Sequence, residues 1–444
     1  MRERFLKVTP DAEQRQEERY RLWLSGQGIP FINDEAKAMY QERVMMIKDA
    51  VQLKKKPARV PLSPSCGFFP MEYAGITMYD AMYDYAALQK AFEKYNRDFA
   101  TDTVAGPGMI VPGKPLEILG LKLYKWPGYG VSKEREYQFV EGEYMKQDEY
   151  MDLIDDPTAF FLNKYLPRIF GTLEPFQGFP SLPPMNEIPN IPPTFAALGS
   201  DVMKAVYDNL YDAGQEILRW RAKVGEITVN IMKEGFPGLS GGFTKAPFDV
   251  IGDSLRGTRG VMLDIYRYPD ELKEACERLT PIMIKSGVAG CRASGHLMPY
   301  IPLHKGADGF MSDEQFATFY WPTLRKVIIG LINEGMVPIL FAEGAYNQRL
   351  EVISDLPKGM CIWYFDRTDM VRAKATVGRV ACIMGNFPLA LLCAGNPDEV
   401  RAECKSLMQA MKPGGGYIFS TGAGIQGSKP ENVKAMIETA KEFS

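Results

Sequence analysis

The sequence predicts an α/β protein built on a (β/α)8 TIM barrel, with an N-terminal helical extension and long insertions rich in Pro and Gly. Short apolar runs that resemble buried strands recur along the chain, and most of them are separated by segments of helical periodicity. The number of these repeats favours a closed barrel over an open doubly wound sheet. The 444 residues are 46% hydrophobic and 24% charged, as in ordinary globular proteins. We therefore expect a barrel over residues 59–444, preceded by the helical extension at residues 1–58.

The first half of the chain supplies the start of the barrel. Apolar positions three and four apart at residues 35–47 predict a helix within the extension. Residues 59–64 and 99–107 predict the first two strands, with a helix around residues 82–96 between them. Residues 108–200 are rich in Pro, Gly and aromatic side chains. Because Pro fixes φ and removes a backbone donor, we expect this stretch to lack regular structure and to form long excursions over the barrel, where sites often lie.

The second half repeats strands and helices more regularly. A long helix is expected at residues 202–235, and further helices extend to residue 290. A helix at residues 313–333 begins after a Ser312 cap with Glu314 in its first turn. The remaining strands are predicted at residues 298–303, 337–341, 361–365, 380–384 and 417–419.

Composition and motifs exclude several classes of function. The formal charge is −3, and Lys and Arg are concentrated only around Lys54-Lys55-Lys56, so no nucleic-acid partner is expected. The N-terminus contains no apolar signal core and the chain no run of 18 apolar residues, which predicts a cytoplasmic protein without a membrane partner. Seven cysteines without a CxxC pair indicate reduced thiols. No phosphate-binding fingerprint occurs, so we expect no nucleotide, nicotinamide or flavin site.

Polar residues follow successive predicted strands. The chemistry of a barrel lies at the carboxyl ends of its strands, which selects His304, Glu343 and Asp366 as candidate catalytic residues. His304 and Glu343, with Asp366, could bind a Zn²⁺ that keeps an open position and acts as a Lewis acid. Without metal, the same side chains could act as general acid and base on a leaving oxygen. A purely structural alternative pairs His304 with Asp308 and lets Asp366 and Asp369 cap the next helix.

Further residues near these strand ends are candidates for binding the substrate. They are Lys305, Tyr346, Arg349 and Asn386, with Asn386 expected to orient the substrate. Aromatic side chains such as Tyr346 could line a pocket for an aromatic ring, although such residues are more often simply part of the core. We interpret His296 as an ordinary loop histidine.

Several motifs resemble the uroporphyrinogen decarboxylase superfamily over residues 60–444, most strongly after residue 238. They are Gly238-Leu-Ser-Gly-Gly-Phe-Thr-Lys-Ala-Pro-Phe-Asp249, Gly306-Ala-Asp-Gly-Phe-Met-Ser312 with Tyr320-Trp-Pro322, Gly385-Asn-Phe-Pro388, and Gly416-Tyr-Ile-Phe-Ser-Thr-Gly-Ala-Gly-Ile425 with Lys429-Pro-Glu-Asn432. The resemblance implies a (β/α)8 barrel. It also implies either decarboxylation of a porphyrinogen or methyl transfer with a corrinoid, because the superfamily contains both activities.

The sequence departs from both well-known branches. Residues 59–67 and 102–108 lack the Arg-Gln-Ala-Gly-Arg type motif and the Asp that the decarboxylases carry at early strand ends, which disfavours a substrate with many carboxylates. The zinc-thiolate site of the methylcobalamin:coenzyme M branch is also missing, because Glu343 stands where a Cys ligand would lie and Gly422-Ala-Gly424 contains no Cys. Glu343 suggests a harder or metal-free site, suited to an oxygen-bearing substrate.

The resemblance therefore implies, most closely, a corrinoid-linked methyltransferase of the O-demethylase type. Such an enzyme moves a methyl group from a small, for example methoxylated aromatic, donor to the Co(I) corrinoid (cobalamin) of a partner protein. The corrinoid is expected on a partner because the sequence has no DxHxxG motif. A decarboxylase or lyase on the same barrel is the alternative, and a non-catalytic corrinoid-binding module is a third interpretation. The methyl donor, a bound Zn²⁺ and a homodimer are left open.

Overall fold

A parallel sheet forms the centre of the computed structural model, which describes residues 5–180 and 182–444. Six strands lie in the order β4-β5-β6-β7-β8-β9, and each is parallel to the next. Their bounds are β4 Gly242–Phe243, β5 Pro299–Leu303, β6 Ile339–Ala342, β7 Ile362–Phe365, β8 Cys382–Phe387 and β9 Tyr417–Thr421. Five of them coincide, within a few residues, with the strands predicted after residue 290.

Two extended segments close this sheet into a barrel. Leu62 forms a parallel bridge with Phe419 of β9. The backbone N–H of Asp102 donates to the carbonyl of Leu62, and that of Val104 donates to the carbonyl of Pro237, just before β4. The segments around Leu62 and Asp102 thus occupy the first two strand positions, and the predicted (β/α)8 barrel is confirmed.

These two segments are shorter and less regular than the strands predicted at residues 59–64 and 99–107. Pro61 and Pro64 flank the bridging residue Leu62 and have no N–H to donate, so a continuous ladder cannot form there. A single backbone–backbone hydrogen bond connects the second segment to the segment around Leu62, and another connects it to the segment before β4. The sequence pattern located both strand positions but overestimated their length.

Helices surround the strands on the outside. Those between the first and second strand positions are α3 Phe69–Ala74, α4 Met78–Tyr83 and α5 Tyr85–Asp98. Those after β4 and beyond are α12 Pro247–Asp249, η6 Val250–Leu255, α13 Gly257–Arg267, α14 Pro269–Ser294, α15 Asp313–Gln315, η7 Phe316–Tyr320, α16 Trp321–Asn333, α17 Leu350–Ile353, α18 Met370–Ala375, η8 Val377–Arg379, α19 Leu389–Ala394, α20 Pro397–Met411 and α21 Pro430–Phe443. Ser312 caps α15 as predicted, and Gln315 completes the capping box.

The N-terminal extension covers the amino-terminal end of the barrel. It contains α1 Ala12–Ser25 and α2 Asp34–Gln52, and the first four residues of the predicted extension lie outside the described part of the chain. Buried side chains such as Trp23 and Val44 share one apolar cluster with Ile339 and Ile362 of the barrel strands. Because this end is filled by apolar packing, the carboxyl ends of the strands form the accessible end of the barrel.

The stretch at residues 108–200 contains more regular structure than predicted. It forms α6 Gly113–Leu119, a small sheet of order β2-β1-β3 (β1 Tyr124–Pro127, β2 Gly130–Val131, β3 Gln138–Phe139), η1 Gln147–Glu149, α7 Tyr150–Asp155, α8 Pro157–Phe160, η2 Phe161–Tyr165, α9 Leu166–Ile169, η3 Gly171–Gly178, η4 Pro183–Asn186, η5 Ile188–Asn190 and α10 Ile191–Leu198. Several prolines occupy the first turns of these helices, where the missing N–H is no cost. Pro therefore begins short helices here instead of preventing them.

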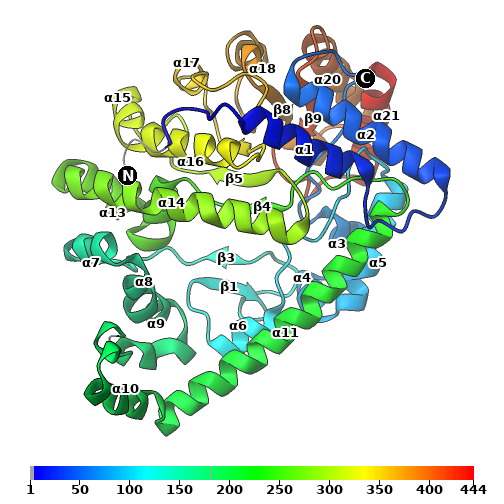
Figure 1. Cartoon of the computed structure of the whole chain (residues 1–444). Coiled ribbons are helices and arrows are strands. Elements are labelled where there is room, and N and C mark those ends of the chain that lie inside the picture. Colours follow the sequence, from blue (N-terminus) through cyan, green and yellow to red (C-terminus); the bar gives the residue numbers. More distant parts are fainter. Residues whose placement is uncertain (1–4, 181) are drawn as a thin grey trace.

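A long helix, α11 Asp201–Met232, follows this insertion and returns the chain to the barrel. Figure 1 shows the insertion as a lobe on one side of β4 and β5, with α11 along its outer edge. The helix was predicted at residues 202–235. No helix in the described part of the chain is long and apolar enough to span a bilayer.

Candidate active site

A cavity of about 770 Å³ lies at the carboxyl ends of β5 and β6 and extends toward the small sheet of the insertion. The residues that line it are Tyr124, Phe139, Glu141, Lys245, Gly252, Asp253, Ser254, Thr258, His304, Lys305, Ala307, Asp308, Gly309, Phe310, Glu343, Gly344, Ala345 and Arg367. The set combines three aromatic rings with charges of both signs. Of the residues predicted from the sequence, His304, Lys305 and Glu343 lie on the cavity wall.

His304 lies between two carboxylates. Its Nδ1 is 2.6 Å from Oδ2 of Asp253, and its Nε2 is 3.3 Å from Oε2 of Glu343. Burial lowers the pKa of His304, but the hydrogen bond with Asp253 and the charges of Asp249, Asp253 and Glu343 outweigh this effect, so the pKa is raised above its ordinary value of 6.5. The ring therefore favours the protonated form, with about a third of the side chain exposed to the cavity.

Asp253 holds this imidazole and two lysines. Its carboxylate lies 2.6 Å from Nζ of Lys245 and 3.2 Å from Nζ of Lys305. Burial alone would raise the pKa of Asp253, yet the hydrogen bond with His304 and the charge of Lys245 hold that pKa well below its ordinary value. Asp253 is thus a fixed anion that orients His304 and neutralises part of the lysine charge.

Asp249 supports the loop that carries His304. It is fully buried and accepts hydrogen bonds from the backbone N–H groups of His304 (3.0 Å) and Lys305 (2.9 Å) and from the hydroxyl of Tyr320 (2.7 Å). Burial and the nearby Asp253 carboxylate raise the pKa of Asp249. Its position behind the loop makes it a positioning residue, since its oxygens face the backbone and not the cavity.

Asp366 and Asn386 do not line the cavity. Oδ2 of Asp366 accepts the backbone N–H of Gly344 at 2.9 Å, which fixes the turn beside Glu343, and burial raises the pKa of Asp366. Asn386 lies inside β8, which extends three residues beyond the predicted run, and its amide donates to the carbonyl of Thr368 at 2.7 Å. Both side chains stabilise the strand ends from beside the cavity.

Tyr346 and Arg349 also lie behind the cavity wall. The hydroxyl of Tyr346 donates to the carbonyl of Leu303 at 3.0 Å. Arg349 is 1% exposed, donates to the carbonyl of Gly306 and forms an ion pair with Asp313. Neither side chain is open to a ligand here, because each is occupied by the loop that follows β5.

Of the purely structural roles predicted for these residues, the helix cap by Asp369 is observed and the pairing of His304 with Asp308 is not. Asp369 caps α18 by accepting the N–H groups of Val371 and Arg372. His304 pairs with Asp253 and not with Asp308, which instead accepts the N–H of Gln348. His296 lies at the opposite, buried end of β5, where its Nε2 is 2.9 Å from the carbonyl of Gly238 and burial lowers its pKa to about 4.

Lys245, Asp249 and Asp253 belong to the charged groups around His304 but were not predicted from the sequence. The strand-end rule would have found Lys245, because it follows β4 by two residues. Asp249 and Asp253 are four residues apart within α12 and η6, a spacing that places two carboxylates on one helix face. Glu141 carries no comparable signal, since it reaches the cavity from the insertion.

The donor atoms do not form a zinc site. Within residues 5–180 and 182–444, no group of three or more His, Cys, Asp or Glu side chains is arranged to hold a metal ion. His304 and Glu343 would supply only two ligands, and the other nitrogen of His304 faces Asp253. A protein zinc site normally has at least three ligands, so the residues do not fit the metal predicted at His304 and Glu343.

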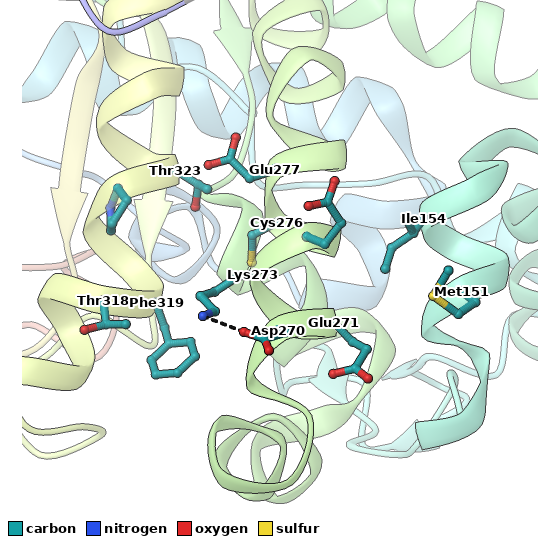
Figure 2. Close-up of a pocket in the computed structure, with 12 residues that line it drawn as sticks. Met151, Ile154, Asp270, Glu271, Lys273, Cys276, Glu277, Thr318, Phe319 and Thr323 are labelled. Atoms are coloured by element: carbon teal, nitrogen blue, oxygen red, sulfur yellow. Dashed lines mark ion pairs between the residues drawn. The ribbon is translucent and has the colours of Figure 1, made fainter. Parts of the chain in front are cut away.

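A second cavity, of about 620 Å³, lies on the outside of the barrel (Figure 2). It is bordered by α7, α14 and the start of α16. Figure 2 shows the Lys273–Asp270 ion pair at this cavity and Cys276 near Thr323. Burial raises the pKa of Cys276, which keeps the thiol protonated. No strand end reaches this cavity, so the cavity at His304 is the better candidate for an active site.

The second half of the chain matches a known protein family. A sequence profile described as uroporphyrinogen decarboxylase (URO-D) matches residues 222–443. Uroporphyrinogen decarboxylase from Coxiella burnetii is 25% identical over 237 residues, which cover 52% of this chain and 65% of that enzyme. The enzyme of the same name from Aromatoleum aromaticum is 30% identical over 214 residues, covering 47% and 58% of the two chains. The chain thus spans less than two thirds of these curated relatives.

Among solved structures, a methyltransferase from Methanosarcina mazei is similar over almost the whole fold. The superposition covers 91% of this chain and 98% of the other, with a TM-score of 0.56 and 15% sequence identity. At this identity the similarity shows a shared fold. The superposition covers a larger share of this chain than the sequence profile does.

Proposed function

Because the chain belongs to the uroporphyrinogen decarboxylase family, we propose that it is a methyltransferase of that superfamily. It moves a methyl group from an ether oxygen of a small substrate to the reduced corrinoid of a partner protein. The observation that carries this proposal is the position of His304, held between Asp253 and Glu343 at the wall of an open cavity, where these carboxylates raise the pKa of the imidazole.

His304 acts as the general acid. In the reaction the bond between the methyl carbon and the ether oxygen breaks, the methyl group passes to the cobalt, and the oxygen takes a proton from the imidazolium. Protonation makes an alkoxide or phenoxide a better leaving group. Asp253 orients the ring and compensates its charge, while Glu343 on the other side of the ring accepts a hydrogen bond from it or from the substrate. The partner's corrinoid supplies only the nucleophile that receives the methyl group.

The cavity lining supports a small neutral aromatic substrate. The acidic side chains of the wall are balanced by Lys245, Lys305, Arg367 and His304. Both lysines face Asp253, so little net charge remains for a substrate with several carboxylates. Tyr124, Phe139 and Phe310 offer apolar faces on which an aromatic ring can pack.

The experiment is a methyl-transfer assay with methoxylated aromatic compounds and a Co(I) corrinoid protein, followed by the absorbance change of the corrinoid. We expect transfer by the wild-type chain and a large loss in His304→Gln and Glu343→Gln. Glu314→Gln is the matched control, because Glu314 is exposed at the start of α15 and does not line the cavity. Full activity of His304→Gln would refute the proposed acid.

Porphyrinogen decarboxylation is the second candidate, because the curated relatives carry that name. It predicts release of CO₂ from a porphyrinogen. Lys245, Lys305 and Arg367 would then have to bind the carboxylates, although two of them face Asp253. Measuring both CO₂ release and methyl transfer with the same preparation distinguishes the two activities.

A further inference from the structure

The long helix α11 carries an exposed apolar seam. Tyr207, Tyr211, Gly214, Leu218, Arg221 and Gly225 follow one another in alternating steps of four and three residues. This is the heptad spacing with which one helix packs along another. Tyr211 is 67% exposed and Leu218 is 57% exposed, and the described part of the chain leaves open space above Gly214 and Gly225.

The remaining faces of α11 are already used within the chain. Met203, Val206, Ala213, Ile227 and Ile231 point into the protein and are buried. Hydrogen bonds from Tyr85 to Glu216 and from Asn230 to Glu93 hold α5 against another side of the helix. The seam therefore lies on the side of α11 that the described part of the chain leaves exposed, although the hydroxyl of Tyr207 also donates to the carbonyl of Leu198. Figure 1 shows α11 itself along the outer edge of the insertion lobe. A contiguous apolar helix face of this kind marks an interaction surface.

We propose that the α11 seam is a homodimer interface, in which α11 of one chain packs antiparallel against α11 of a second copy. The sizes of the seam residues are complementary in this arrangement. With the twofold axis near residue 216, Tyr207 lies opposite Gly225 and Leu218 lies opposite Gly214 of the other copy. Large side chains thus fill the spaces above glycines, as close helix packing requires.

The charged residues of α11 also favour the antiparallel arrangement. Tyr211 lies opposite Arg221, so the guanidinium packs on an aromatic ring. The first half of α11 carries four carboxylates and one lysine, and the second half carries three cations and one carboxylate, so the halves are net acidic and net basic. These residues are Asp201, Asp208, Asp212, Glu216 and Lys204, and then Arg219, Arg221, Lys223 and Glu226. Antiparallel packing places the acidic half against the basic half. A parallel pair would place Arg221 against Arg221 and glycine against glycine, which leaves like charges and voids in contact.

The residues beside the seam are also self-complementary. On one side Leu210 and Ile217, which are 37% and 36% exposed, extend the apolar surface. The twofold axis brings Ile217 against its own copy there, and on the other side it brings Gln215 against Gln215, where the two amides can hydrogen-bond. In a twofold interface the same surface of both copies is in contact, so that surface must be complementary to itself. A surface that binds an unrelated protein does not have this requirement.

Sedimentation velocity of the full-length protein tests the dimer, and size and shape are the readouts. We expect a dimer at micromolar concentration that becomes monomeric in Leu218→Glu and in Gly225→Leu. The double variant Tyr207→Ala with Gly225→Leu exchanges the large and small partners and is expected to restore the dimer. Far-UV circular dichroism and thermal unfolding confirm that each variant is folded, and Tyr266→Glu, on the exposed surface of α13, is the matched control.

Cysteine cross-linking tests the orientation. Gln215→Cys is expected to form a disulfide with its own copy under mild oxidation. Asp208→Cys lies on the same side of the same helix, but antiparallel packing separates the two copies of this position by about 21 Å, so no cross-link is expected. A monomeric wild type, a dimer that survives both Leu218→Glu and Gly225→Leu, or equal cross-linking at the two positions would overturn the proposal.

Discussion

Nδ1 of His304 lies 2.6 Å from Oδ2 of Asp253, a residue 51 positions earlier in the chain. The pairing joins the loop after β5 to the π-helical turn η6 after β4. It raises the pKa of the imidazole above its ordinary value, which favours the protonated form of the ring.

The two histidines of the chain are expected to titrate in opposite directions from an ordinary imidazole. His296 should stay neutral down to a pKa of about 4, because its burial disfavours the charged form. His304 should titrate above 6.5. Nitrogen-15 NMR of histidine-labelled protein can follow both rings, and His304→Gln assigns them. Two titrations at the ordinary value would contradict the structure.

These shifts also predict the direction of the pH dependence of stability. The raised pKa of His304 stabilises the fold fully below pH 6.5, and this contribution is lost as the pH rises through the folded-state pKa. The depressed pKa of His296 acts oppositely, because protonation of the unfolded chain below pH 6.5 reduces stability until about pH 4. Urea unfolding between pH 4 and pH 9, repeated with His304→Gln, separates the two contributions.

Removal of the Asp253 charge should weaken the acid. In Asp253→Asn the pKa of His304 is expected to fall, so that methyl transfer is lost above a lower pH than in the wild type. His304→Ala should reduce the rate by about 10² to 10⁴, the usual contribution of a general acid. Asp398→Asn, at the exposed start of α20, is the control. A pH profile of Asp253→Asn identical to that of the wild type would exclude this role for Asp253.

Asp249 should matter for stability and loop geometry. Asp249→Ala removes the acceptor of two backbone N–H groups and of the Tyr320 hydroxyl, all of them buried or partly buried. We expect a loss of about 3 kcal/mol in the free energy of unfolding. Tyr320→Phe removes one of the three bonds and should cost about 1 kcal/mol. Urea denaturation measures both losses, and equal effects of the two variants would contradict the assigned hydrogen bonds.

Substitution of Arg349 distinguishes a role in binding the substrate from a role in positioning the loop after β5. It is buried, with Asp313 and the carbonyl of Gly306 as partners. Arg349→Ala should therefore lower the melting temperature and, through the displaced loop, kcat. If Arg349 bound the substrate directly, KM would rise while the melting temperature stayed unchanged.

A chelator should have no effect on the proposed acid chemistry. The pair His304 and Glu343 lacks a third ligand among the described residues, so treatment with EDTA should leave methyl transfer and the melting temperature unchanged. Elemental analysis of the purified protein checks the metal content directly. If the purified protein contained stoichiometric zinc that His304→Ala lost, the role of His304 as a proton donor would be wrong, and zinc would act as a Lewis acid instead.

The barrel was predictable because its later strands are continuous apolar runs, such as residues 361–365, each followed by a helix with a recognisable start. The first two positions were harder to define. Pro61 and Pro64 interrupt hydrogen bonding around Leu62, and the pairing that defines this position is with Phe419, at the other end of the chain. No local pattern encodes such a partner.

The site was predictable in part for the same reason. His304 and Glu343 follow strands directly, so the strand-end rule brought them to one face. The direction in which a side chain points is not encoded in this rule, and Asp366 and Asn386 turn to backbone groups instead of the cavity. Asp253 lies ten residues beyond Phe243, the last residue of β4, and its contact with His304 depends on the tertiary packing of η6.

Closure of the barrel by Leu62 and Phe419 also sets an order of events during synthesis. The backbone N–H of Ser65 donates to the hydroxyl of Thr421 across 356 residues, and Leu62 forms its bridge with Phe419 of β9. At about 5 to 20 residues per second, the ribosome needs roughly 20 to 70 s to produce the partner of this early segment. During that time residues 60–104 have no strand to pair with from the carboxyl-terminal side. The barrel of the nascent chain must therefore remain open between the segment around Leu62 and β9 until translation is almost complete.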